Sequence, residues 1–143
     1  MKTKKFVFGV LIAVLIIVVA GAIIYALQYK EKAITSFFDN DASKIDRIDI
    51  VDGSNGNVIT VDGKKVISDI SVYLSTLKLI KVHNEPSTGW SYRFSVYESN
   101  TEKLNITFVG EGFCTIGETK YKIKKSTDIT VKSLFDEAKN PAK

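Results

Sequence analysis

The chain has 143 residues, with 20 basic and 16 acidic side chains, one cysteine and one histidine. Five of the basic residues and one of the acidic residues lie in residues 1–32, so the remaining 15 basic and 15 acidic side chains balance. A neutral domain lacks the positive face that binds a phosphate backbone, so we expect no nucleic-acid partner. One cysteine cannot form an internal disulfide, and one cysteine with one histidine cannot supply the four ligands of a structural zinc site. We therefore expect no metal and no cofactor.

Residues 6–27, FVFGVLIAVLIIVVAGAIIYAL, form an apolar run without a charged side chain. As a helix this run would be about 33 Å long, enough to cross a hydrocarbon core of about 30 Å. We predict a basic tail at 1–5, a transmembrane signal-anchor helix at 6–27, a stalk at 28–43 and an extracytoplasmic domain at 44–143. The count of basic residues near the two ends does not decide the orientation, but a short lysine tail before an apolar core is the order found in secretory signals, which favours an amino end inside the cell. The domain then lies outside, attached to the cell membrane by one crossing.

A secretory signal is the alternative interpretation of the same segment. Such a signal also begins with lysines before an apolar core, and Ala20 to Ala22 supplies small residues for cleavage. However, the run stays apolar through Leu27, where a cleaved signal normally turns polar. Tyr25 and Tyr29 also occupy the position of an interfacial aromatic belt. An uncleaved anchor is favoured, and a secreted domain released after Ala22 remains the alternative.

The first half of the domain combines a hairpin with an amphipathic helix. Ile34, Phe37 and Phe38 are too apolar for a solvated stalk and are expected to pack on the domain. Residues 44–51 alternate apolar and charged side chains, and a turn rich in Gly, Asn and Asp connects them to the β-branched segment 57–61. This pattern predicts a β-hairpin. Apolar residues from Val66 to Leu77 then follow the spacing of a helix that covers a sheet, and residues 79–83 suggest a short strand.

The second half predicts an antiparallel meander. After the loop at 84–89, residues 90–98 place alternate apolar side chains on one face, and residues 104–108, 113–116 and 119–125 suggest three more strands. Thr127 or Asp128 can cap a final helix that ends near Asn140. The predicted fold is α+β: a twisted antiparallel sheet of about five to seven strands, with two helices packed on one face.

The side chains available for catalysis are few. His83 is the one histidine, and no G-x-S-x-G elbow is present. Cys114 lies within a strand pattern, which indicates a buried thiol. The carboxylates stand singly beside turns, as expected for solvated residues, although two of them could converge as a hydrolase pair. We predict no catalytic residues and a protein that is not an enzyme. The carboxylates considered are Asp62, Asp69, Glu98, Glu102, Glu111 and Glu118.

Two groups of residues are candidates for binding. Trp90, Tyr92 and Arg93 combine the residue types that dominate interface hot spots, next to a projecting loop. Trp90 and Tyr92 are equally explained as the first core residues of their strand. Lys120, Lys122 and Lys124 alternate along one strand and so share a face. Their favoured interpretation is protection of an edge strand against pairing with other chains, and contact with an anionic surface is the alternative.

The layout resembles small membrane-anchored extracytoplasmic proteins of Gram-positive bacteria that are known mainly as domains of unknown function. The resemblance rests on the anchor MKTKKFVFGVLIAVLIIVVAGAIIYAL, on GWSYRFSVYE, and on the segments KLNITFVG and TKYKIKK. It implies a location and no activity. We predict a non-enzymatic, membrane-anchored binding module with a protein or cell-envelope partner, with immunity and sensing as candidate roles. The alternatives are a hydrolase of an envelope polymer and a secreted inhibitor-like domain.

Overall fold

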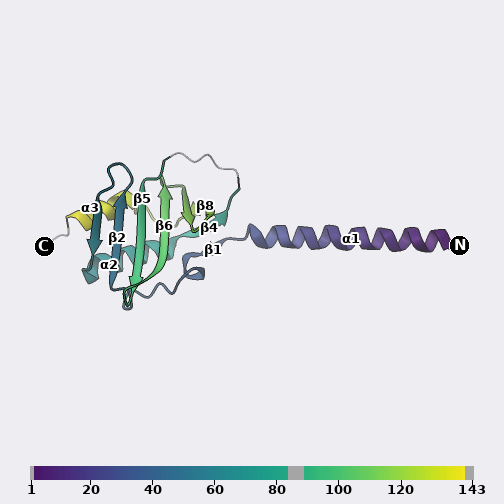
Figure 1. Ribbon diagram of the computed structural model, residues 1–143, viewed down its shortest axis with the longest axis horizontal. Coiled ribbons are helices and arrows are strands. Elements are labelled where there is room, and N and C mark those ends of the chain that lie inside the picture. The colour runs from purple at the N-terminus through teal and green to yellow at the C-terminus, as the bar shows by residue number, and fades with distance from the viewer. Residues whose placement is uncertain (1, 84–88, 141–143) are drawn as a thin grey trace. The chain divides into compact units, whose positions relative to one another are not determined.

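The chain has an α+β fold with one antiparallel sheet, which confirms the predicted class. The computed structural model describes residues 2–83 and 89–140, and Figure 1 shows the arrangement of its helices and strands. The chain divides into two compact units, one ending at Lys30 and one beginning at Glu31. Most of the loop predicted at 84–89 lies outside the described residues.

The first unit is the helix α1 (Lys2–Gln28). Within the described residues, its segment Lys4–Gln28 is the one helix long and apolar enough to cross a membrane, and none of its most apolar stretch is buried by the protein. A helix that exposes only apolar side chains is unstable in water. Both a membrane anchor and a secretory signal have this character.

The second unit contains eight described strands where five to seven were expected, together with helical elements. In chain order the elements are β1 (Lys32–Ala33), the 3-10 helix η1 (Ile34–Ser36), β2 (Arg47–Asp52), β3 (Val58–Val61), α2 (Lys64–Thr76), β4 (Lys78–Lys81), β5 (Tyr92–Glu98), β6 (Thr101–Val109), β7 (Phe113–Ile116), β8 (Thr119–Lys124) and α3 (Val131–Lys139). The strands lie side by side in the order β1-β4-β8-β7-β6-β5-β2-β3, and every pair is antiparallel. The predicted hairpin is confirmed as β2 paired with β3.

Both long helices of this unit cover the same face of the sheet (Figure 1). Tyr73 of α2 lies against Phe108 of β6, and Phe135 of α3 lies against Tyr92 of β5, with ring centroids 6.3 Å and 4.9 Å apart. Tyr92 and Phe108 are directly opposed in the β5–β6 ladder, so they point to the same side. We call the opposite side of the sheet the open face. It carries polar side chains such as Arg93, which alternate with the core residues along each strand.

Two segments differ in detail from the sequence-based expectations. The segment expected to be a stalk, 28–43, contains β1 and η1, and Ile34 and Phe38 are buried in the core as anticipated. The final helix begins two or three residues later than predicted. Its cap is Thr130, whose side chain accepts a hydrogen bond from the Ser133 amide while the Ser133 hydroxyl accepts one from the Thr130 amide. This reciprocal pair satisfies two backbone N–H donors at the start of the helix.

The phenol of Tyr73 is a buried polar group without a partner. The side chain is 0% exposed, and its hydroxyl has no hydrogen-bond partner among the described residues. Because an unsatisfied buried donor costs about 1–3 kcal/mol, we expect Tyr73→Phe to raise the free energy of unfolding by about 1 kcal/mol. Urea unfolding of the full chain in detergent measures this change. If Tyr73→Phe is clearly less stable than the parent chain, the hydroxyl has a bound partner.

Cys114 is 1% exposed, which confirms the buried thiol that its strand pattern indicated, and burial raises its pKa from 9.0 to about 12. The unfolded chain therefore loses this proton first as the pH rises, so stability is unaffected below about pH 8.5 and falls between there and pH 12. At pH 10.5 we expect this thiol to account for a loss of about 2 kcal/mol relative to pH 8. Urea unfolding at both pH values measures the loss. The loss is expected to be smaller in Cys114→Ala, and an equal loss in both chains would contradict this assignment.

Candidate functional site

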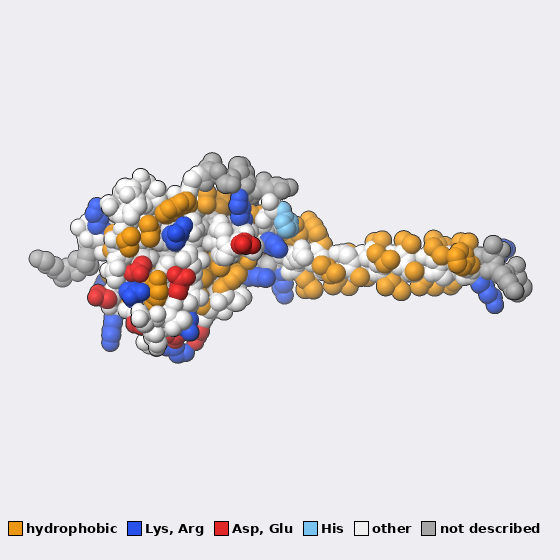
Figure 2. Space-filling model, in the orientation of Figure 1, with side chains coloured by type: hydrophobic (Ala, Val, Ile, Leu, Met, Phe, Trp, Pro, Cys, Tyr) orange, Lys and Arg blue, Asp and Glu red, His pale blue; other side chains and the backbone are white. Residues whose placement is uncertain are grey.

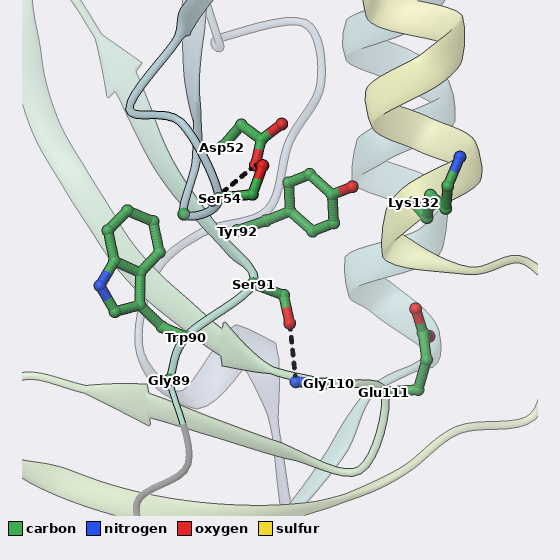
Figure 3. Close-up of a pocket in the computed structure, with 10 residues that line it drawn as sticks. Asp52, Ser54, Gly89, Trp90, Ser91, Tyr92, Gly110, Glu111 and Lys132 are labelled. Atoms are coloured by element: carbon green, nitrogen blue, oxygen red, sulfur yellow. Dashed lines mark hydrogen bonds between the residues drawn. The ribbon is translucent and has the colours of Figure 1, made fainter.

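A pocket of the domain is formed where two turns and the segment that enters β5 meet the start of α3. It has a volume of about 460 Å³. Its walls come from the β2–β3 turn at 52–54, the segment 89–92 that enters β5, the β6–β7 turn at 110–111, and Lys132 of α3. Figure 3 shows Trp90 on one side of the opening, with Lys132 and Glu111 on the other. The sheet order explains this convergence, since β2, β5 and β6 are neighbours and present these ends together.

Trp90 lies at the rim of this pocket and is partly exposed. It precedes β5, which begins at Tyr92, so it is not the first core residue of the strand. The Arg93 guanidinium carbon lies 4.9 Å from the centroid of the indole ring, within the range of a cation–π contact. Arg93 is itself held by a hydrogen bond of 3.2 Å from its Nε to the Thr107 hydroxyl. The indole is therefore supported from the open face of the sheet.

The backbone of Gly53 lies directly against Trp90. A Cβ atom at residue 53 would lie 2.3 Å from the Trp90 carbonyl oxygen and 2.8 Å from the indole Cε3. Both distances are shorter than any tolerated contact, so only glycine allows this approach. The Gly53 amide also donates to the Ser91 carbonyl at 2.8 Å. The β2–β3 turn thus fixes the position of the Trp90 segment.

Ser91 joins the turns that form the pocket. Its amide donates to the Phe108 carbonyl at 2.8 Å, and its hydroxyl accepts from the Gly110 amide at 3.0 Å (Figure 3). Together with the bond from Gly53, these contacts connect the β2–β3 turn to the end of β6. The hydroxyl hydrogen of Ser91 remains able to donate to a ligand.

Tyr92 forms the inner wall. Its ring packs on Phe135 with centroids 4.9 Å apart, and burial, reinforced by the charge of Asp52, raises the pKa of its phenol. The hydroxyl therefore stays protonated at neutral pH and serves as a hydrogen-bond donor. Tyr92 therefore packs against the core, as one of the two interpretations made from the sequence expected, and it also lines the pocket.

Three charged side chains complete the lining, each held by a neighbour. Asp52 accepts hydrogen bonds from the Ser54 hydroxyl and the Ser54 amide at 2.6 Å and 2.8 Å, and these bonds lower its pKa. Glu111 accepts from the Lys125 ammonium at 2.9 Å and from the Val131 amide at 3.2 Å. Lys132 donates to Asp136 at 2.6 Å. The walls therefore offer fixed charges and hydroxyl groups beside an aromatic ring.

The pocket contains two carboxylates, which is the feature that a hydrolase would need. A glycosidase requires one carboxyl group held protonated to act as the general acid. Asp52 is held ionised by the turn that it closes. Both oxygens of Glu111 hold the start of α3 and Lys125 in place. This arrangement is better suited to binding a polar ligand than to hydrolysing one.

The lysines of the second candidate lie elsewhere in the domain. Lys120, Lys122 and Lys124 belong to β8, which pairs with β4 on one side and β7 on the other. The interpretation of these lysines as protection of an edge strand is therefore wrong. It failed because the pairing of β4 with β8 brings together segments about 40 residues apart, which local periodicity cannot reveal.

The remaining candidates for chemistry are separate from the pocket. His83 and Glu118 line a second hollow of about 380 Å³ beside Lys120. Among the described residues, no three of the His, Cys, Asp and Glu side chains come together as metal ligands. Of the pocket lining, sequence reasoning identified Trp90 and Tyr92 by residue type. It did not select Asp52, Ser91 or Lys132, because their convergence depends on the sheet order.

No family model, curated protein or solved structure matches this chain. Its function is therefore inferred from the sequence and from the geometry of the structure.

Proposed function

We propose that this protein is a non-enzymatic binding module, anchored by α1 in the cell membrane with its α+β domain outside the cell. The domain binds a protein or cell-envelope partner through the pocket beside Trp90. The anchor is supported by the charge-free apolar run at 6–27 and by the helix that it forms. The outward orientation is supported by the short lysine tail before that run.

The observation that carries this proposal is the position of Trp90. The chain has one tryptophan, and the fold holds it at the rim of a pocket rather than in the core. Gly53 and Arg93 fix the indole, so little conformational entropy is lost when a partner covers it. Large, rigid aromatic side chains beside arginine are typical of residues that dominate binding energy.

A photo-crosslinking experiment in the native membrane tests the proposal. A photoreactive residue replaces Ser54 at the exposed rim of the pocket in the full chain, and a second chain carries it at Ser75 on the exposed side of α2. We expect a discrete adduct from residue 54 that is absent from residue 75 and is lost in Trp90→Ala. Digestion of the adduct by a protease or by a muramidase distinguishes a protein partner from a wall polymer.

The intact mass of the same bait tests the anchor. A chain running from Met1 to Lys143 supports the anchored form. A soluble fragment beginning at Ile23 would instead assign the secreted form. An adduct that persists unchanged in Trp90→Ala would contradict the pocket as the binding site.

A further inference from the structure

A cluster of lysines occupies one end of the open face. Along β8, lysines alternate with the core residues Tyr121 and Ile123, so they point away from the helices. The neighbouring β4 adds a lysine that is directly opposed to Lys124. Figure 2 shows lysine side chains over the end of the sheet where β4 and β8 lie. We call this cluster the basic face: Lys78, Lys120, Lys122 and Lys124.

The basic face is positively charged although the domain as a whole is neutral. In the part of the chain that the structure describes, Glu31 lies 2.8 Å from Lys124 and 4.0 Å from Lys78. Both lysines share this one carboxylate, and Lys124, followed by Lys78, lowers the pKa of Glu31. Lys78, Lys122 and Lys124 against this one glutamate leave a net charge of about +2 at this end of the face.

Apolar side chains lie among these lysines. Lys122 is directly opposed by Ile80 on β4 and by Phe113 on β7, and both of these side chains are partly exposed. Lysine has no intrinsic preference for a strand, and the edge-protection role is excluded because β8 is an interior strand. A surface that combines lysines with exposed apolar side chains is typical of contacts with the headgroup region of a bilayer.

We infer that the basic face docks on the anionic phospholipid headgroups of the membrane in which α1 is anchored. The inference rests on the proposed anchor. Tyr29, Lys30 and Glu31 alone separate α1 from β1 in the chain, and three extended residues reach about 10 Å. Since β1 pairs with β4, and β4 with β8, the strands that carry the lysines follow closely on this short connection. Lys30 and Lys32 add positive charge to the same segment.

Fluorescence quenching in reconstituted bilayers tests the inference. The full chain is placed in vesicles of phosphatidylcholine, with or without phosphatidylglycerol, that contain lipids spin-labelled near the headgroup. A fluorophore is attached at Thr115→Cys, which lies opposite Lys120 in the ladder. A second chain carries it at Thr60→Cys on β3, at the far edge of the sheet. Cys114 is buried and does not react in the folded chain.

We expect stronger quenching at residue 115 in the anionic vesicles, and none at residue 60. Each lysine near an anionic surface favours docking about fivefold. The combined substitution of Lys78, Lys122 and Lys124 by glutamine is therefore expected to lower the docked-to-free ratio about a hundredfold. In the control chain, glutamine replaces Lys64, Lys65 and Lys139, which removes the same charge from the exposed parts of α2 and α3. Quenching at residue 115 is expected to be unchanged in this control. Because salt screens such contacts, about 0.5 M salt also abolishes quenching in the unsubstituted chain.

Equal quenching in neutral and anionic vesicles, or quenching insensitive to salt, would overturn the inference even if the triple variant failed to fold. Salt-sensitive capture by a soluble polyphosphate, with no dependence on lipid charge, would assign the face to a wall polymer instead. An alkaline carbonate wash is applied first. Loss of the chain from the vesicles at that step overturns the proposed anchor along with the inference, whereas a retained chain without quenching overturns the docking alone.

Discussion

Replacing Gly53 by alanine is expected to displace Trp90 and to abolish the crosslink from the pocket. The new methyl group would lie 2.3 Å from the Trp90 carbonyl oxygen and 2.8 Å from the indole Cε3, so the Trp90 segment has to move. Overpacking of this kind typically costs about 1–3 kcal/mol. Because the chain has one tryptophan, its emission reports on this position alone. We expect the emission maximum of Gly53→Ala to shift to longer wavelength as the indole becomes more exposed to water.

The matched control for this prediction is Gly112→Ala, in the turn that also contributes Glu111 to the pocket. A Cβ atom at residue 112 would have no neighbour within 4 Å, and the backbone there does not have a positive φ. The control is therefore expected to retain the emission spectrum, the stability and the crosslink of the parent chain. Equal emission from both alanine variants would show that Trp90 does not depend on Gly53 for its position.

The role of Gly53 explains why sequence reasoning recognised the turn but not the site. A turn rich in Gly, Asn and Asp was expected between β2 and β3, and it is present. Gly53 itself does not adopt a positive φ, in contrast to Gly56 in the same turn. It is required because another segment passes close to it. Such a requirement depends on the pairing of β2 with β5, which no local pattern reveals.

Strict alternation predicted the central strands well. β2 and β6 bury every second side chain over several residues, and β5 alternates apolar with polar side chains although Ser95 is buried between Phe94 and Val96. β1 and η1 are too short to display a period, and they were assigned to the stalk. The position of β8 was the larger error. Its lysines have the same spacing in an edge strand as in an interior one, and only the long-range pairing with β4 separates the two cases.

Sequence reasoning identified only some of the residues that line the candidate pocket. Trp90 and Tyr92 stood out because aromatic residues next to a loop are unusual outside binding surfaces and cores. Asp52, Glu111 and Lys132 come from three separated segments, and each is an ordinary turn or helix residue when considered alone. Their common location follows from the sheet order and from the packing of α3 on Tyr92.

Phe108→Ala is expected to produce a larger loss of stability than any of the substitutions above, about 3–5 kcal/mol. Phe108 is 0% exposed, and its ring contacts Phe94 at 5.3 Å and Tyr73 at 6.3 Å between centroids. It therefore connects the sheet to α2. A domain of this size is typically stable by about 5–15 kcal/mol in total, so the variant is expected to lose a large part of its stability. Urea unfolding of the full chain, followed by Trp90 emission, measures the loss.

Two further substitutions separate the cavity from other effects of this change. Phe108→Leu keeps most of the apolar volume and is expected to cost about 1.5 kcal/mol or less. Val58→Ala removes a side chain that is 61% exposed on β3 and is expected to change stability by less than about 0.5 kcal/mol.

The Phe108 carbonyl also accepts the Ser91 amide, so relaxation of β6 around a cavity would move a wall of the pocket. Phe108→Ala is thus expected to weaken the crosslink from residue 54 even under conditions where the chain remains folded, whereas Val58→Ala leaves the crosslink intact. An unchanged crosslink in folded Phe108→Ala would show that the pocket is positioned independently of the core beneath it.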